Sequence, residues 1–485
     1  MNKLYTKKNR SGLIMAFALA GSMLSLTPRY ALGAGFISGY RPVALNYVDL
    51  SDDAVVTAQP IQTQELTKKR PASTNTAIVV ALDHVITADL KGIGGAFNEQ
   101  GGEAFMSLPE AARKVVVKAL FHPQAGAGLT LCRTAVGASD FGLDAYSYSE
   151  TADDYDMQHF SVERDTQSVL PFIRAAKAEN PELRIFASPW SPPGWMKVSG
   201  KMEGGNETPA ANVLKNSPQI YKAYALYFSK YVQAYAEHGV IIDRLLIQNE
   251  PDMNPKYPGC DMSPEQMSVL IADYVRPRFI QNGLRTEIWA GTFRGKRSDA
   301  KAFMAAKQAD KAYGVGLQYC PPRQVRELRS SNPDLKIMHT EGKCFNSSNT
   351  VQQARSRFAE ISNWLNAGCE NFCYWNMVLN ENSESGWGWK QNSLIKIDRQ
   401  AGTVTYNPDF APVALLSRFI RPGDELLRVK TPKGTKAIAV RNNCQLVVFL
   451  QNDTTAPVSQ SIDISGREHT VELPAQSLCA ITFKR

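Results

Sequence analysis

The sequence alternates strand-like and helix-like segments, and this alternation limits the possible folds more than any other feature. From residue 92 onward, eight short apolar runs are each followed by a segment with helical spacing. The runs contain few polar residues, as expected when helices cover both faces of a parallel sheet. The expected strands are residues 92–97, 129–137, 184–190, 243–250, 286–292, 313–320, 335–342 and 370–379. The expected helices are residues 109–121, 161–179, 218–238, 263–282, 298–311, 321–331, 350–367 and 409–420.

Eight such units predict an α/β fold, a (β/α)8 TIM barrel over residues 92–420. An aromatic stripe at helical spacing over 221–235 is expected to pack against this barrel. Short alternating strands return over residues 421–485, which predicts an appended antiparallel β-sandwich domain. Residues 77–91 also form a strand-like pattern and are expected to join that domain. We expect the polar stretch 35–76 to form a linker or a loosely packed arm.

The first 34 residues have the pattern of a secretory signal peptide. A basic start is followed by an apolar run over residues 13–26 and then by small residues at Ala31, Gly33 and Ala34. The alternative is a short membrane anchor, although the run is shorter than a bilayer span requires. We expect an exported protein, periplasmic or extracellular, without stable membrane insertion.

The charge does not favour a polyanionic partner. The formal net charge of the chain is +8, but residues 1–34 contribute five positive charges and no acidic residue, which leaves +3 without them. Such a balance gives no support for binding nucleic acid. The eight cysteines are few for a disulfide framework, although Cys444 and Cys479 could meet in the C-terminal sheet. The scattered histidines form no ligand pair, so we expect neither a metal site nor a cofactor.

Two of the expected strands end in glutamate. The run 243–250 ends at Glu250 and is followed by Pro251, and the run 335–342 contains Glu341 followed by Gly342. In such barrels, functional side chains lie at the carboxyl ends of the strands. A single glutamate at a strand end is usually a surface or capping residue. Two carboxyl groups at the mouth of one barrel are what glycoside hydrolysis requires, one as an acid and one as a nucleophile or base.

Other strand ends agree with a site for sugars. Trp190 ends the third expected strand, Trp375 lies in the eighth, and Trp387 follows in the next loop. Tryptophan rings stack on sugar rings, although a single tryptophan is more often part of a core. Arg133 lies within an apolar run, where its charge needs a partner, and Glu341 is the expected one. Asp140 could accept hydrogen bonds from sugar hydroxyls, or could be a turn residue.

From about residue 77 to residue 485 the sequence resembles glycoside hydrolase family 30, which includes lysosomal glucosylceramidase. The resemblance rests on six motifs: GIGGAF at 92–97, SDF at 139–141, ASPWSPPGWMK at 187–197, QNEP at 248–251, HTEG at 339–342 and YWNMVLN at 374–380. The family fold is a (β/α)8 barrel with a side β domain built from both ends of the chain. The resemblance therefore implies the same architecture as the strand and helix pattern.

The resemblance also implies roles for individual residues. It makes Glu250 the acid/base and Glu341 the nucleophile of a retaining double displacement. Asn249 would contact the sugar 2-hydroxyl, and Arg133 would lie beside the nucleophile. Asp140, Trp190 and Trp375 would surround the terminal sugar.

The chain departs from animal glucosylceramidases at two strand ends. It has Gln318-Tyr319-Cys320 in place of His-Trp-Tyr, so that Tyr319 becomes a candidate substrate contact, and Asn98-Glu99 in place of Thr-Asp. These differences lie around the substrate, so the sequence does not determine which leaving group the substrate carries. The expected substrate is a β-linked carbohydrate, either a β-glucan such as β-1,6-glucan or glucosylceramide and small β-glucosides. The alternatives are β-xylosidase or xylanase specificity, and a glycan-binding protein without catalysis.

Overall fold

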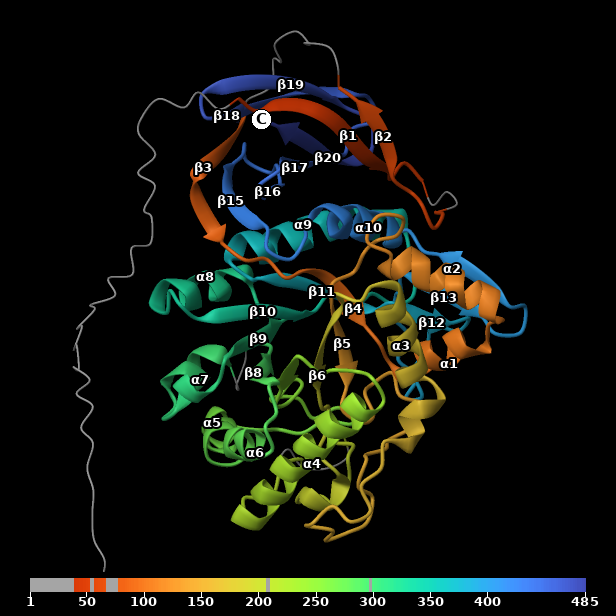
Figure 1. The fold of residues 1–485 in the computed structure, drawn as a ribbon, viewed down its shortest axis with the longest axis vertical. Coiled ribbons are helices and arrows are strands. Elements are labelled where there is room, and N and C mark those ends of the chain that lie inside the picture. The colour runs from red at the N-terminus through yellow and green to blue at the C-terminus, as the bar shows by residue number, and fades with distance from the viewer. Residues whose placement is uncertain (1–38, 53–55, 67–76, 206–209, 296–298) are drawn as a thin grey trace, which may run out of the picture. The chain divides into compact units, whose positions relative to one another are not determined.

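The computed structural model describes residues 39–52, 56–66, 77–205, 210–295 and 299–485. The expected signal peptide, residues 1–34, lies outside the described residues. Eight parallel strands form one sheet in the order β10-β9-β8-β7-β6-β5-β4-β11 (Figure 1). They are β4 Gly92–Ala96, β5 Leu131–Ala135, β6 Arg184–Ser188, β7 Arg244–Leu246, β8 Glu287–Phe293, β9 Gly314–Gln318, β10 Lys336–Glu341 and β11 Asn371–Asn376. The TIM barrel predicted from the sequence is therefore confirmed.

The sheet closes between β10 and β11 through single hydrogen bonds. The backbone N–H of Glu370 donates to Ile337 O at 3.0 Å, and that of Gly342 donates to Cys373 O at 2.7 Å. Large apolar side chains fill the interior: Leu131, Phe186, Leu246, Trp289, Met338 and Cys373 form one buried cluster. The barrel is thus a packed core, and only its ends are available for chemistry.

Helices cover the outside of the barrel. They are α2 Glu110–Phe121, α3 Val169–Glu179, α4 Pro218–Glu237, α5 Pro264–Val269, α6 Arg276–Gln281, α7 Ala300–Ala305, α8 Pro322–Ser331, α9 Val351–Ala367 and α10 Phe410–Phe419. A π-helical turn over Leu270–Val275 joins α5 to α6. The aromatic stripe of α4 is buried, which confirms its expected role in packing.

One helix and one small sheet beside the barrel were not anticipated. Helix α1 (Glu99–Ser107) follows β4 directly, where Asn98 caps it by accepting from Gly101 N at 2.7 Å. The region after residue 379, expected to be a loop, contains a small sheet of β12 (Val378–Asn380), β13 (Ile395–Asp398) and β14 (Thr403–Tyr406). These short strands contain few residues, so their hydrophobic alternation is too brief to be recognised in the sequence.

The second sheet has nine strands in the order β19-β18-β3-β15-β16-β17-β20-β1-β2. They are β1 Arg41–Asp49, β2 Gln62–Glu65, β3 Ile78–Thr87, β15 Glu425–Lys430, β16 Ala437–Arg441, β17 Leu446–Asn452, β18 Val458–Ile464, β19 Arg467–Leu473 and β20 Ser477–Lys484. Their pairing is antiparallel except between β18 and β3. Instead of two separate sheets, one continuous sheet encloses its own core with side chains that include Leu45, Leu427 and Val448.

Two segments of residues 35–76, which were expected to form a linker or arm, belong to the nine-stranded sheet. Residues Arg41–Asp49 form β1, which pairs with β20, and Gln62–Glu65 form β2 at the edge of the sheet. Strand β1 places Leu45 and Val48 in buried positions, but its hydrogen-bonding partner lies at the other end of the chain. A local reading of the sequence does not reveal such a partner.

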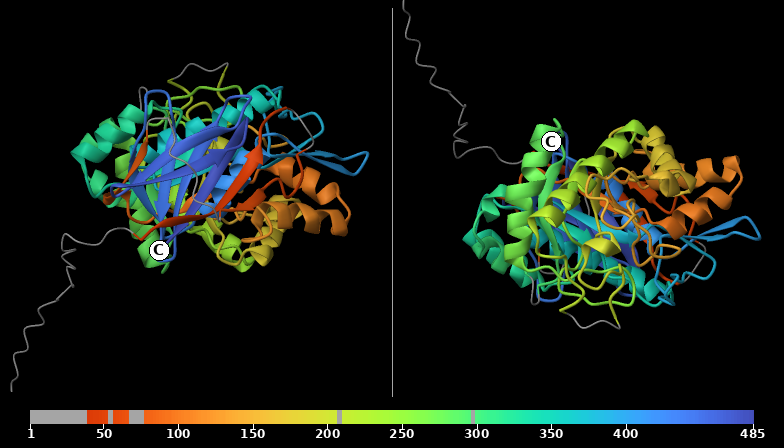
Figure 2. Two further views of the ribbon diagram at one scale, coloured as in Figure 1. Left: turned by 90° about the horizontal axis from the view of Figure 1, so that it is seen from above. Right: turned by 90° about the horizontal axis from the view of Figure 1, so that it is seen from below.

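Helices α9 and α10 lie between the nine-stranded sheet and the barrel, as Figure 1 shows. Helix α9 contacts β15 and β16, and helix α10 contacts β1 and β20. The left view of Figure 2 shows this sheet from above. Among the described residues, no helix is both long and apolar enough for a bilayer span. Cys444 and Cys479 are free, the first exposed and the second buried, so the considered disulfide does not form.

Candidate active site

The carboxyl ends of the parallel strands bring most of the sequence-predicted residues together. Arg133 lies in β5, Asn249 and Glu250 follow β7, Tyr319 follows β9, and Glu341 ends β10. All five side chains are connected by hydrogen bonds or ion pairs at one end of the barrel. The two glutamates, which are distant in sequence, therefore belong to one site.

Glu341 is held at both carboxylate oxygens. Its Oε2 accepts from Arg133 Nη1 at 2.6 Å and from Gln318 Nε2 at 3.2 Å, and its Oε1 accepts from Tyr319 Oη at 2.5 Å. The expected pairing with Arg133 is confirmed. Tyr319 adopts a left-handed backbone with φ of 56°, a conformation that non-glycine residues adopt at a cost. That cost is offset where the conformation directs the phenol at a functional carboxylate.

Glu250 has a different environment. Its backbone is also left-handed, with φ of 43°, and its N–H donates to Thr292 O at 3.1 Å. Its Oε1 accepts from Gln318 Nε2 at 3.2 Å and lies 3.4 Å from Arg294 Nε. Burial and the nearby charge of Glu341 raise the pKa of Glu250 to about 7, although Arg294 acts in the opposite direction. Glu250 can therefore hold a proton near neutral pH.

Arg133 is the hub of the site and is fully buried. Besides Glu341, it donates to Ser188 Oγ at 2.7 Å and to Asn249 Oδ1 at 2.7 Å. Thr292 Oγ1 donates to the same Asn249 oxygen at 2.9 Å. Because protein donors occupy this oxygen, the amide nitrogen of Asn249 is the group that remains for a ligand.

Two tryptophans from different strands meet beside this hub. The rings of Trp190 and Trp375 lie 5.2 Å apart at 27°, and the Arg133 guanidinium lies 4.4 Å from the Trp190 ring. They are only 2% and 1% exposed, so neither offers an open stacking surface of the kind expected. They instead form a wall of the site, and Trp375 Nε1 has no hydrogen-bond partner among the described residues.

Asp140 lies buried near the two glutamates. Burial, followed by the charges of Glu341 and Glu250, raises the pKa of Asp140 well above its usual range. Its Oδ1 has no hydrogen-bond partner in the described part of the chain. A buried polar atom without a partner is costly, and a ligand hydroxyl would relieve that cost. Asp140 also lies in a turn, which the hydrogen bond from Gly142 N to Ser139 O closes at 3.1 Å, so its turn position and its proximity to the glutamates occur together.

Trp387 lies farther out than the other predicted residues. It is half-buried on the segment between β12 and β13, and Trp389 beside it is 50% exposed. The neighbouring Gly386 approaches Leu143 so closely that a Cβ there would lie 2.5 Å from the Leu143 carbonyl oxygen. Trp387 is thus next to the loop that carries Asp140, without a ring contact to Trp190 or Trp375 among the described residues.

The departures at residues 98 and 99 have structural roles. Asn98 caps α1 and donates to Asn376 Oδ1 at 2.9 Å. Glu99 accepts from Arg164 Nε at 2.6 Å and from Leu143 N at 2.8 Å. Glu99 thus fixes the loop after β5 and does not contact Glu250 or Glu341.

The sequence analysis named Gln318 only as a departure near the substrate and did not identify three further residues of the site: Ser188, Thr292 and Arg294. Gln318 contacts both glutamates, and Thr340 Oγ1 fixes its orientation by donating to its Oε1 at 2.8 Å. Each of the four lies at or next to the end of a strand, which is the one signal that could have found them.

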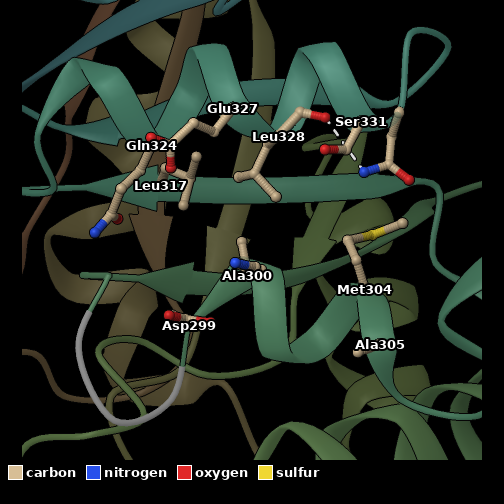
Figure 3. A pocket seen from close by; sticks show the side chains of 11 residues that line it. Asp299, Ala300, Met304, Ala305, Leu317, Gln324, Glu327, Leu328 and Ser331 are labelled. Atoms are coloured by element: carbon tan, nitrogen blue, oxygen red, sulfur yellow. Dashed lines mark hydrogen bonds between the residues drawn. The ribbon is translucent and has the colours of Figure 1, made fainter.

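A separate cavity of about 490 Å³ lies between α7 and α8 on the outside of the barrel (Figure 3). Met304, Leu317 and Leu328 form part of its lining. Neither glutamate of the site lines it, and its lining contains no aromatic residue that could stack on a sugar.

Comparisons with known proteins agree with this geometry. Residues 90–287 match the family model for the glycosyl hydrolase family 30 TIM-barrel domain. The chain is 27% identical over 430 residues to a putative glucosylceramidase 3 of Caenorhabditis elegans, covering 81% of this chain and 80% of that protein. It is 34% identical over 206 residues to the endo-1,6-β-D-glucanase BGN16.3 of Trichoderma harzianum, covering 41% and 42%. In fold it is similar to the crystal structure of SrfJ from Salmonella typhimurium, with a TM-score of 0.80 at 22% identity, covering 92% and 100%.

Proposed function

Because the chain belongs to glycosyl hydrolase family 30 and is a glycoside hydrolase, we propose that it cleaves β-glucosidic bonds by a retaining double displacement. The main support is the bridge made by Gln318. Its Nε2 lies 3.2 Å from one oxygen of each glutamate, so these oxygens are no more than twice that distance apart. Inverting enzymes hold their carboxyl groups roughly 6.5–9.5 Å apart to admit a water molecule, and retaining enzymes hold them closer.

In the first step, Glu341 attacks the anomeric carbon and the glycosidic bond breaks. Glu250 transfers its proton to the leaving oxygen, so that the leaving group departs as an alcohol. The pKa of about 7 supports this role, because Glu250 still carries a proton near neutral pH. Arg133, Gln318 and Tyr319 direct the carboxylate of Glu341 towards the sugar.

In the second step, water replaces Glu341 at the anomeric carbon. Once Glu341 is esterified by the sugar, it carries no negative charge, and one cause of the raised Glu250 pKa disappears. The pKa of Glu250 then falls, and the carboxylate takes a proton from the attacking water. One residue therefore serves as acid and then as base.

The remaining predicted residues are proposed to bind the sugar ring. Asn249 would donate from its amide nitrogen to the 2-hydroxyl, because its oxygen is already occupied. The unpartnered Oδ1 of Asp140 and Nε1 of Trp375 would bind further hydroxyls. Trp190 would complete the wall, and Trp387 would contact substrate nearer the rim.

Two substrate classes follow from the relatives, glucosylceramide and β-1,6-glucan. The C. elegans protein is named as a putative glucosylceramidase, and the T. harzianum protein is named as an endo-1,6-β-D-glucanase. We favour β-glucan or a small β-glucoside. The polar groups around the two glutamates, including Arg294, support a hydroxylated substrate.

Covalent trapping tests the mechanism. A 2-deoxy-2-fluoro-β-glucosyl fluoride should form a stable adduct, and peptide mass spectrometry should locate it on Glu341. Glu341→Gln should fold, as judged by circular dichroism, and should neither form the adduct nor hydrolyse β-glucosides or β-1,6-glucan. If folded wild-type protein binds glucan without adduct or turnover, the protein is a glycan-binding protein instead.

We also propose that the protein is exported. The support is the basic, apolar and small-residue pattern of residues 1–34. Mass spectrometry of protein recovered from its native cells should find a new N-terminus close to residue 34. An intact residue 1 would contradict export by cleavage.

A further inference from the structure

We propose that Arg294 recognises the leaving group, and that it selects a leaving group with sugar hydroxyls over a plain alkyl chain. The proposal rests on the proposed function and adds a specificity-determining residue to it. Arg294 follows β8 by one residue and its side chain is only 16% exposed. Its Nε lies 3.4 Å from Glu250 Oε1.

The two arginines of the site differ in how their donors are used. Every nitrogen of the Arg133 guanidinium has a hydrogen-bond acceptor, among them Ser188, Asn249 and Glu341. Arg294, in contrast, places Nε 3.4 Å from Glu250 Oε1, and its buried Nη1 has no hydrogen-bond partner in the described part of the chain. A buried charged donor without an acceptor costs free energy, so a ligand acceptor at this position would be favourable.

The position of Arg294 identifies which part of the substrate it meets. Glu250 must contact the leaving oxygen to protonate it, so the leaving group extends from the side of the site where Glu250 lies. Arg294 contacts Glu250, whereas Arg133 contacts Glu341. We therefore expect Arg294 Nη1 to meet the leaving group, whereas Arg133 serves the sugar that becomes bound to Glu341.

An aromatic side chain, Tyr257, lies near both the tryptophan wall and Arg294. Tyr257 lies in the loop after β7, seven residues beyond Glu250, and packs against the cluster of Trp190 and Trp375. Its phenol is close enough to both Glu250 and Arg294 for their charges to affect its pKa, which burial raises above the usual range. An aromatic surface next to a planar donor suits a sugar ring with hydroxyls.

A matched pair of substrates tests the proposal. A β-1,6-linked glucose disaccharide and a simple primary-alkyl β-glucoside both release a primary alcohol and both need the proton of Glu250. They differ in the hydroxyls of the leaving group. Arg294→Gln should lower kcat/KM for the disaccharide about 10- to 100-fold, the loss expected from one or two hydrogen bonds to a charged group. The alkyl glucoside should lose clearly less than the disaccharide, because it loses only the effect of Arg294 on the pKa of Glu250.

Arg294→Lys separates charge from hydrogen-bond geometry, since lysine keeps the positive charge beside Glu250 but lacks the planar guanidinium. We expect it to keep the wild-type pH profile and to retain most of the disaccharide defect. Arg323→Gln on α8 is the control, because Arg323 is 77% exposed and pairs with Glu327 at 3.3 Å instead of with Glu250 or Glu341. Labelling with the 2-fluoro glucosyl fluoride counts the correctly folded sites in each preparation.

Equal losses on both substrates would overturn the proposal and make Arg294 a positioning residue for Glu250. No loss on either would also overturn it. If wild-type protein hydrolyses neither substrate nor forms the covalent adduct, the proposed function fails before Arg294 is tested. Wild-type protein can instead form the adduct and hydrolyse the alkyl glucoside. If Arg294→Gln then leaves the ratio of kcat/KM for the two substrates unchanged, only the inference on Arg294 fails.

Discussion

At the scale of single residues, Glu250 and Glu341 have the same chemistry and different neighbours. Glu341 receives hydrogen bonds from three side chains, including the Arg133 guanidinium. Glu250 receives one, from Gln318, and lies 3.4 Å from Arg294 Nε, while burial and the charge of Glu341 raise its pKa. The two roles required for glycoside hydrolysis therefore follow from their environments.

The pKa of Glu250 predicts the pH dependence of catalysis. Glu250 must be protonated to act as an acid, so kcat/KM for an alkyl β-glucoside should be high below pH 7 and fall as pH rises through about 7. In Glu250→Gln, kcat/KM should no longer fall as pH rises through about 7; this fall is the basic limb of the pH profile. Activity on substrates with poor leaving groups should drop at least about 100-fold. Rates measured from pH 4 to pH 9 check both. A basic limb that remains in Glu250→Gln would assign it to another group.

Arg133→Met should affect both stability and catalysis. It leaves the buried Glu341 without its ion pair, which costs about 3–5 kcal/mol of unfolding free energy. It also frees the carboxylate to move, so kcat/KM should fall at least about 100-fold in the folded fraction. Urea unfolding and kinetics at low temperature measure the two effects.

A buried arginine at the other end of the barrel provides the matched control. Arg244 begins β7 and pairs with Glu370 and with Glu287, the latter at 2.9 Å. Arg244→Met should cost a similar unfolding free energy and leave kcat/KM of the folded protein within about threefold of wild type. Equal kinetic losses in both variants would show that the Arg133 effect is general destabilisation.

The residue pairs of the site were only partly predictable. The partnership of Arg133 with Glu341 could be predicted because a charge in an apolar strand must be compensated. Gln318 could not be singled out, because a neutral amide at a strand end has no such requirement. Its importance comes from Thr340 fixing its orientation between the two glutamates.

At the scale of elements, α9 (Val351–Ala367) illustrates how local sequence determines a helix. Thr350 Oγ1 accepts a hydrogen bond from Gln353 N at 3.4 Å. In turn, Gln353 Oε1 accepts one from Thr350 N at 3.1 Å. Gly368 ends the helix in the left-handed conformation, with φ of 110°. These signals bracket the helix within one residue of the range expected from the sequence.

Thr350→Ala should therefore destabilise the protein by about 1 kcal/mol through loss of this cap. Because α9 lies on the outside of the barrel, kcat/KM at 25 °C should stay within about twofold of wild type. Thermal unfolding and initial rates test the two statements. Thr350→Ser, which keeps the hydroxyl, should behave as wild type.

The elements missed by sequence analysis share a physical property. Helix α1 contains Gly101 and Gly102, which weaken its helical pattern, and both approach other backbone segments closely. Strand β2 is wholly exposed, so its sequence QTQE has no hydrophobic side. Both elements depend on contacts with distant segments, whereas the barrel strands have recognisable apolar sequences of their own.

At the scale of the whole molecule, the barrel and the nine-stranded sheet share one core. Val48, Ile438 and Phe449 of the sheet belong to the same buried cluster as the barrel helices. Ser362 and Asn366 of α9 also donate to Ala437 O in β16, at 3.3 and 2.9 Å. The two parts should therefore depend on each other for stability.

This interdependence predicts one cooperative unfolding transition. Phe449→Ala should remove about 3–5 kcal/mol and lower the temperature of that single transition, and activity should be lost together with it. Differential scanning calorimetry with activity measured along the same ramp checks this. Two resolved transitions, with activity surviving the first, would show that the sheet unfolds independently.

The pairing of β1 with β20 also affects the order of events during synthesis. Residues 41–49 leave the ribosome early but have to wait for residues 477–484 before they can complete the sheet. At about 5–20 residues per second, that wait is on the order of half a minute. During it, the unpaired edge of β1 is free to aggregate or to be held by a chaperone. The nine-stranded sheet can therefore be completed only at the end of translation, because the partner of β1 is the last strand of the chain.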